Sequence, residues 1–119
     1  MNKIIFSVFV LCLILTGCLS FKSLKSTTFI KANDEFILGN NVHGKFFVRV
    51  TNTSNYDVII WKYPIDGGRH SPITVNPFST IKINVDKNTA IRIENQSNEE
   101  VAIKLKVNGD TGLSMGYKN

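Results

Sequence analysis

The sequence is poor in the residues that many functional classes require. In 119 residues it has two cysteines, three prolines, two histidines and one tryptophan. Two cysteines allow one disulfide at most, which excludes a small protein held together by a disulfide framework. The composition, 43% hydrophobic and 19% charged, is close to the globular average and excludes a wholly disordered or collagen-like chain.

Motifs that carry chemistry are also scarce. The sequence has no His-Glu-x-x-His, no phosphate-binding glycine loop and no cysteine beyond residue 18. Its carboxylates are scattered, without a spacing that would pair two of them. We therefore expect a protein that is not an enzyme and that uses no metal or other cofactor.

The N-terminus has the organisation of an export signal. Met1-Asn2-Lys3 is a short positive region, and Ile4–Leu15 is an apolar stretch of 12 residues that includes one serine. A membrane-spanning helix needs about 20 apolar residues, so this stretch has the length of a signal peptide rather than of a permanent span.

The next residues resemble the lipobox of bacterial lipoproteins. Leu15-Thr16-Gly17-Cys18 has an aliphatic residue and two small residues before a cysteine. The resemblance implies that Cys18 carries an S-diacylglycerol and an N-acyl group and that residues 1–17 are a cleaved signal peptide. The alternative is an ordinary secretory signal with a cysteine at its cleavage site.

An acylated Cys18 implies attachment to a membrane of the bacterial cell envelope. Each buried methylene contributes about 0.8 kcal/mol, so two or three acyl chains hold a protein stably. In lipoproteins of diderm bacteria, an aspartate after the cysteine commonly retains the protein in the inner membrane. This chain has Leu19 there, which implies the cell outer membrane in a diderm and the outer face of the cell membrane in a monoderm.

The mature chain is expected to consist of a tether and a domain. Residues 18–33 are rich in Ser, Thr and Lys and predict an acylated cysteine followed by a flexible tether. Its lysines either lie near anionic headgroups or only keep a solvated linker soluble. Residues 34–119 form the predicted domain, although Thr27–Lys31 is β-prone and could already belong to it.

The predicted domain is all-β. Short apolar runs alternate with polar residues and are separated by Asn, Gly, Asp and Pro, which indicates antiparallel sheets with one side in water. The expected strands are Glu35–Leu38, Lys45–Asn52, Asp57–Tyr63, Ser71–Val75, Thr80–Val85, Thr89–Asn95, Glu99–Val107 and Leu113–Tyr117. These seven or eight short strands predict a small antiparallel β-sandwich, Ig-like or jelly-roll-like.

The sequence also repeats itself. Residues 48–62 align without gaps with residues 91–105, and six of the fifteen positions are identical. Each copy contains Asn-x-Ser-Asn between two apolar runs and predicts a hairpin. In the second copy Ile93 would pair with Val101, and Asn98 would take positive φ in a three-residue loop. The likeness reflects either an ancient duplication or hairpin chemistry alone.

Four large side chains form the predicted contact surface. In the first hairpin, Phe47, Ile59, Trp61 and Tyr63 would share the outward face. Exposed apolar patches usually mark contact sites, and Trp and Tyr rings suit a glycan or the centre of a protein interface. The alternative is that another strand, or residues 27–38, covers these side chains as core.

The remaining candidates are weaker. His43 and His70 lie beside glycines in expected loops, and with Asp66 they lack the spacing of a known metal site. Without Lys3 the mature chain has 13 basic and 9 acidic residues, a net charge of +4. This charge is dispersed along the sequence, so we expect no nucleic-acid partner.

These features predict a lipid-anchored envelope lipoprotein that acts by binding or scaffolding, with an envelope protein or a glycan as its partner. One alternative is a carbohydrate-binding surface lipoprotein. Another is an assembly or pilot lipoprotein of a secretion or pilus system. A small envelope hydrolase that uses His43 or His70 is the least favoured alternative.

The lipobox resemblance leads to a direct test. A Cys18→Ser variant should accumulate as an uncleaved precursor that incorporates no radiolabelled fatty acid, because the acyl acceptor is gone. Normal labelling of the variant would show that Cys18 is not the acylated residue.

Overall fold

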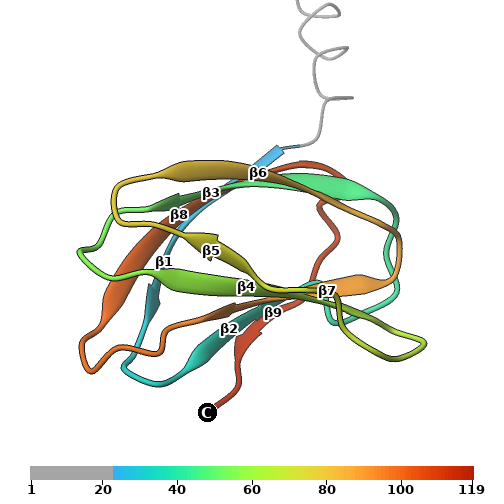
Figure 1. Ribbon diagram of the computed structural model, residues 1–119. Helices are drawn as coiled ribbons and strands as arrows, with labels where there is room; N and C mark the ends of the chain where they lie inside the picture. Colours follow the sequence, from blue (N-terminus) through green and yellow to red (C-terminus); the bar gives the residue numbers. More distant parts are fainter. Residues whose placement is uncertain (1–22) are drawn as a thin grey trace, which may run out of the picture.

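Two antiparallel sheets, packed face to face, form the part of the chain that the structure describes (Figure 1). The structure is a computed structural model and describes residues 23–119, so the predicted signal peptide and Cys18 lie outside the described residues. The strands are β1 (Ser23–Ile30), β2 (Glu35–Leu38), β3 (Phe46–Asn52), β4 (Val58–Pro64), β5 (Ile73–Val75), β6 (Thr80–Val85), β7 (Thr89–Glu94), β8 (Val101–Gly109) and β9 (Met115–Tyr117). No helix in residues 23–119 is long and apolar enough to span a membrane.

The strand order is that of a jelly roll. One sheet has four strands in the order β1-β8-β3-β6, and the other has five in the order β5-β4-β7-β2-β9. Neighbouring strands are antiparallel throughout both sheets. The first eight strands form the two four-stranded layers of a jelly roll, and β9 extends one of them beside β2. The prediction of a small all-β sandwich is therefore confirmed.

The core lies between the sheets and follows the alternation seen in the sequence. Successive residues of a strand point to opposite faces, so the apolar set of each strand is buried and the polar set faces water. The buried set comprises Ile30, Phe36, Leu38, Phe46, Val48, Val50, Val58, Ile60, Val75, Ile83, Val85, Ile91, Ile93, Val101, Ile103, Leu105 and Val107.

The predicted tether is wrong over the residues that the structure describes. Ser23–Ile30 is strand β1, which pairs with β8 along its whole length. The alternation is hidden in the sequence because two inward positions are hydroxyl residues, Ser26 and Thr28. Their side chains satisfy each other, with 3.0 Å between Ser26 Oγ and Thr28 Oγ1. The domain therefore includes residues 23–33, only five residues after Cys18.

The two predicted hairpins are also wrong. β3 belongs to the four-stranded sheet and β4 to the five-stranded one, and β7 and β8 are divided in the same way. The Asn-x-Ser segments are thus arches that carry the chain from one sheet to the other. Within the sheets β3 pairs with β8 and β4 pairs with β7. Asn98 does not have the positive φ that the hairpin loop required.

A buried asparagine organises each arch. Asn95 is fully buried, and its Nδ2 donates to the carbonyls of Ile30 (3.0 Å), Lys31 (3.1 Å) and Glu99 (2.7 Å). Its Oδ1 accepts from the backbone N–H and the hydroxyl of Ser97, at 2.9 Å and 2.6 Å. The side chain therefore joins the arch to the end of β1 and stands in for the backbone partners that the crossing removes.

The first arch repeats this arrangement. Asn52 is also fully buried and donates to the carbonyls of Tyr56 (2.6 Å) and Val75 (3.0 Å). Its Oδ1 accepts from the backbone N–H and the hydroxyl of Ser54. Val75 pairs with Val58 just as Ile30 pairs with Val101. The sequence repeat thus corresponds to a pseudo-twofold relation in which β1–β4 match β5–β8.

The arch geometry predicts which asparagines stabilise the domain. Asn52→Ala and Asn95→Ala should each lower the free energy of unfolding by about 2–3 kcal/mol, because several buried backbone groups lose their partner. Asn55→Ala and Asn98→Ala are matched controls, since both residues are exposed, and should change it by less than about 0.5 kcal/mol. Urea titrations of the four variants would measure this; equal losses would contradict the arch role.

Candidate functional site

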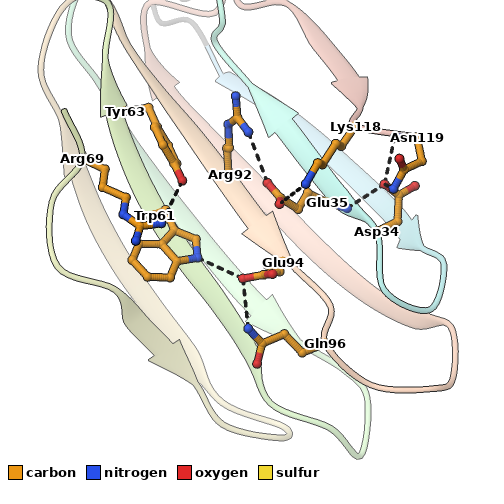
Figure 2. A network of polar contacts seen from close by, with 10 residues as sticks. All are labelled: Asp34, Glu35, Trp61, Tyr63, Arg69, Arg92, Glu94, Gln96, Lys118 and Asn119. Atoms are coloured by element: carbon orange, nitrogen blue, oxygen red, sulfur yellow. Dashed lines mark hydrogen bonds and ion pairs between the residues drawn. The ribbon is translucent and has the colours of Figure 1, made fainter. Parts of the chain in front are cut away.

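An aromatic and charged layer covers the outer face of the five-stranded sheet. We call it the aromatic face, and its members share an outward position and partial burial. They are Ile59, Trp61 and Tyr63 of β4, Arg92 and Glu94 of β7, and Glu35 of β2. Figure 2 shows polar contacts of these side chains in separate groups: Trp61 with Glu94 and Gln96, Tyr63 with Arg69, and Arg92 with Glu35 and Lys118.

Trp61 is held from its edge and from its face. Its Nε1 donates to Glu94 Oε1 at 3.0 Å, and Gln96 Nε2 donates to the same oxygen at 3.2 Å. The guanidinium of Arg69, from the β4–β5 loop, lies 4.2 Å from the centre of the indole ring. Cation–π attraction at this distance holds the loop against the sheet.

Tyr63 lies between two arginines. The guanidinium of Arg92 is 4.5 Å from the centre of its ring, and Arg69 Nη1 donates weakly to its hydroxyl at 3.4 Å. Two guanidinium groups thus frame two aromatic rings (Figure 2).

Glu35 has unused hydrogen-bonding capacity. Its side chain is only 13% exposed, and it lies 3.6 Å from both Arg92 Nη1 and Lys118 Nζ, which is an ion-pair distance but a long one for hydrogen bonds. Glu35 Oε1 and Arg92 Nε have no hydrogen-bond partner among the described residues, although both atoms are buried. Buried polar atoms without a hydrogen-bond partner are rare in folded proteins. Glu35 and Arg92 are therefore the residues of the aromatic face whose hydrogen-bonding groups are least satisfied.

A hollow of about 580 Å³ adjoins Tyr63 at one end of this face. It is open, and its size is in the range of small-molecule sites. Its lining consists of Asn40, Tyr63, Pro64, Ile65, Gly67, Gly68, Arg69 and Arg92. Both charged residues of the lining are arginines, so the hollow favours a ligand with hydrogen-bond acceptors or negative charge.

The structure brings together three of the four predicted contact residues. Ile59, Trp61 and Tyr63 share the aromatic face, but Phe47 lies on the outer face of the other sheet, where Lys82 Nζ is 4.4 Å from its ring. Grouping Phe47 with them was wrong because β3 and β4 belong to different sheets. The covering strand of the alternative interpretation is not there either: among the described residues, arginine side chains cover the rings.

The histidines have different roles. His43 is buried, with Nδ1 2.6 Å from the carbonyl of Gly44 and Nε2 accepting from the backbone N–H of Thr89 at 3.2 Å. It ties the β2–β3 loop to β7. His70 is exposed in the β4–β5 loop. Among residues 23–119, no three His, Cys, Asp or Glu side chains gather closely enough to hold a metal ion.

One further pattern stands near the C-terminus. Residues 112–116, Gly-Leu-Ser-Met-Gly, have the spacing G-x-S-x-G, which in α/β-hydrolases places a nucleophile on a turn from a strand into a helix. Here the segment leads from a loop into β9, and the backbone N–H of Ser114 donates to Asn41 Oδ1 at 2.9 Å. The surroundings of Ser114 are therefore not those of a nucleophile elbow.

The sequence alone did not indicate Arg69, Arg92, Glu35 or Glu94 as partners of the aromatic rings. Arg92 and Glu94 were expected on a hairpin with β8, whereas β7 pairs with β4 and β2. Arg69 lies in a loop without regular spacing. No local signal joins these residues to Trp61.

No protein-family model and no curated protein matches the sequence. Solved structures share its fold. CapF of Staphylococcus aureus, a capsular polysaccharide assembling protein, superposes with a TM-score of 0.56 at 15% identity over 73% of this chain and 24% of that chain. RmlC of Streptococcus suis, solved in complex with dTDP-D-xylose, superposes with a TM-score of 0.51 at 16% identity over 74% of this chain and 44% of that chain.

These neighbours are sugar-related proteins and overturn one prediction. RmlC and CapF have a cupin-like fold that also occurs in enzymes. The prediction that this chain is not an enzyme, which rested on missing motifs alone, is therefore overturned. The chain spans about a quarter of CapF and less than half of RmlC. At 15–16% identity the likeness shows the fold alone.

The position of Arg69 leads to a test of the aromatic face. Arg69→Ala should increase acrylamide quenching of Trp61, the sole tryptophan, because the guanidinium no longer covers the ring. The free energy of unfolding should fall by no more than about 1 kcal/mol. Arg49→Ala, on the other sheet, is the control. Unchanged quenching in Arg69→Ala would show that the arginine does not shield the indole.

Proposed function

We propose that the protein is a lipid-anchored envelope lipoprotein, attached through acylated Cys18, whose jelly roll binds carbohydrate on the aromatic face. The lipobox resemblance supports the anchor, and Leu19 supports an outer-membrane location if the source is a diderm. The binding role follows from the chemistry of the outer face of the five-stranded sheet.

The observation that carries the binding role is the presence of two aromatic rings, two guanidinium groups and two carboxylates in one outward layer. A sugar ring offers an apolar face of C–H groups and a rim of hydroxyls. Aromatic rings with a polar edge suit the first, and charged donors and acceptors make strong hydrogen bonds to the second. Trp61 and Tyr63 supply the rings, which Arg69 and Arg92 partly cover. Arg92 Nε and Glu35 Oε1 are buried and lack a hydrogen-bond partner within the described residues.

The hollow beside Tyr63 narrows the ligand class. Arg69 and Arg92 are its charged lining, and Asn40 adds an amide. The lining contains no acidic residue, although Arg92 has Glu35 at 3.6 Å outside it. Arginine binds carboxylate and phosphate groups with paired hydrogen bonds, so Arg69 in particular favours a sugar with such a substituent. We therefore favour acidic oligosaccharides over neutral ones.

The fold is consistent with this role. CapF is a capsular polysaccharide assembling protein, and RmlC binds dTDP-D-xylose in its solved complex. The likeness supports a carbohydrate-related role at the level of the fold, while the choice of the aromatic face rests on the contacts described above.

The test uses the sole tryptophan as its own reporter. Titration with acidic oligosaccharides that carry uronic acid or sugar phosphate should change Trp61 fluorescence saturably, and matched neutral oligosaccharides should bind more weakly. Tyr63→Ala should weaken binding about tenfold, which corresponds to about 1.4 kcal/mol. Phe47→Ala removes an aromatic ring from the opposite face and should leave the affinity unchanged.

Two results would contradict the proposal. Trp61 fluorescence that responds to no sugar in the panel would exclude the aromatic face as a glycan site. Equal losses in Tyr63→Ala and Phe47→Ala would show that the sugars bind elsewhere or nonspecifically.

A further inference from the structure

The outer face of the four-stranded sheet carries charge of a single sign. Every basic residue in its strands points outward and is exposed, and together these residues form what we call the cationic face: Lys25, Arg49, Lys82, Lys104 and Lys106. None of the nine acidic residues of the chain lies in β1, β3, β6 or β8. The net charge that seemed dispersed along the sequence is thus concentrated on one face.

Four of these cations form a straight row across the sheet. Lys25 pairs with Lys106, Lys106 with Arg49, and Arg49 with Lys82. Side chains in directly opposite positions have Cβ atoms about 4.5–5.5 Å apart, and like charges there destabilise a sheet. The two ion pairs found within residues 23–119 both involve Glu35 on the other sheet, so they do not offset this repulsion.

The face is also hollowed and carries apolar side chains. A hollow of about 440 Å³ is lined by Lys25, Arg49, Lys104 and Lys106 among others. Phe47 and Phe29 lie on the same side of the sheet and are 36% and 53% exposed. Exposed aromatics among cations suit the boundary between headgroups and acyl chains.

The position of β1 brings this face close to the proposed anchor. Lys25 is seven residues after Cys18, a distance of at most about 24 Å for an extended chain at 3.4 Å per residue. The row that contains Lys25 therefore stays within reach of the headgroups whenever Cys18 is in the bilayer. Anionic lipids attract basic residues only within about a Debye length of the surface, and a connection of this length allows the face to come that close.

We propose that the cationic face docks on the anionic headgroups of the membrane that holds the anchor, with Phe47 and Phe29 at the interface. The inference rests on the anchor of the proposed function but not on its glycan site. In this orientation the four-stranded sheet lies on the membrane and the aromatic face, on the opposite sheet, points away from it.

Lysine footprinting of the acylated full mature chain tests this docking. The protein is bound to vesicles of zwitterionic lipid, or of the same lipid with 30 mol% of an anionic lipid, and acetylated before mass spectrometry. On anionic vesicles four lysines should be acetylated about fivefold more slowly than on zwitterionic vesicles: Lys25, Lys82, Lys104 and Lys106. Added salt should remove this protection. Lys87, exposed in a loop outside the face, is the internal control.

A charge-reversal pair separates docking from folding. Lys106→Glu should abolish the protection and also raise the melting temperature, because it places an acid between Lys25 and Arg49. Lys87→Glu changes the net charge equally and should retain the protection. A destabilised Lys106→Glu variant, or one that stays protected, would contradict the proposal.

The remaining outcomes are distinguishable. Vesicle flotation reports the anchor: no flotation with zwitterionic vesicles means that the anchor has failed, while flotation without lysine protection on anionic vesicles means that the docking has failed. Flotation with anionic vesicles alone would still support docking of the cationic face on anionic headgroups. Flotation with neither kind of vesicle would overturn this docking. Protection by a soluble sulfated polysaccharide but not by anionic vesicles would replace the membrane with a polymer ligand.

Discussion

Two buried side-chain amides hold this jelly roll together where the chain crosses between its sheets. A strand that leaves one sheet for the other exposes backbone groups that the sheets cannot pair, and Asn52 and Asn95 supply those partners inside the protein. The crossings in turn decide the pairing of β3 with β8 and of β4 with β7. Everything that lies on the two outer faces depends on this division of neighbouring segments between opposite sheets.

The division separates two kinds of surface chemistry. On the five-stranded sheet, aromatic rings, arginines and carboxylates contact one another through hydrogen bonds and ion pairs. The strands of the four-stranded sheet carry lysines and an arginine but no acidic residue. A closed two-layer fold keeps these surfaces back to back, so a membrane on one side leaves the other free for a soluble ligand. The proposed glycan site and the proposed docking face are therefore compatible in a single molecule.

The sequence predicted local structure well and spatial neighbours poorly. Alternation predicted eight of the nine strands in the part of the chain that the structure describes, because the period of two follows from the pleat itself. β1 was missed because Ser26 and Thr28 occupy inward positions and bond to each other. The sequence predicts hairpins where the structure has arches, because both have an Asn-rich link between apolar runs and only burial against distant strands distinguishes them. For the same reason the sequence predicts Phe47 beside Trp61. The row through Lys25, Lys106, Arg49 and Lys82 follows only from the register of four strands.

The central claim is that the two faces look in opposite directions when the protein sits on its membrane. Quenching by brominated lipids in anionic vesicles tests it directly, because the native tryptophan at position 61 lies on the outer face of the five-stranded sheet. Trp61 should remain unquenched, whereas a tryptophan placed at position 47, in a Trp61→Phe/Phe47→Trp variant, should be strongly quenched. Equal quenching at both positions, or stronger quenching of Trp61, would contradict the account.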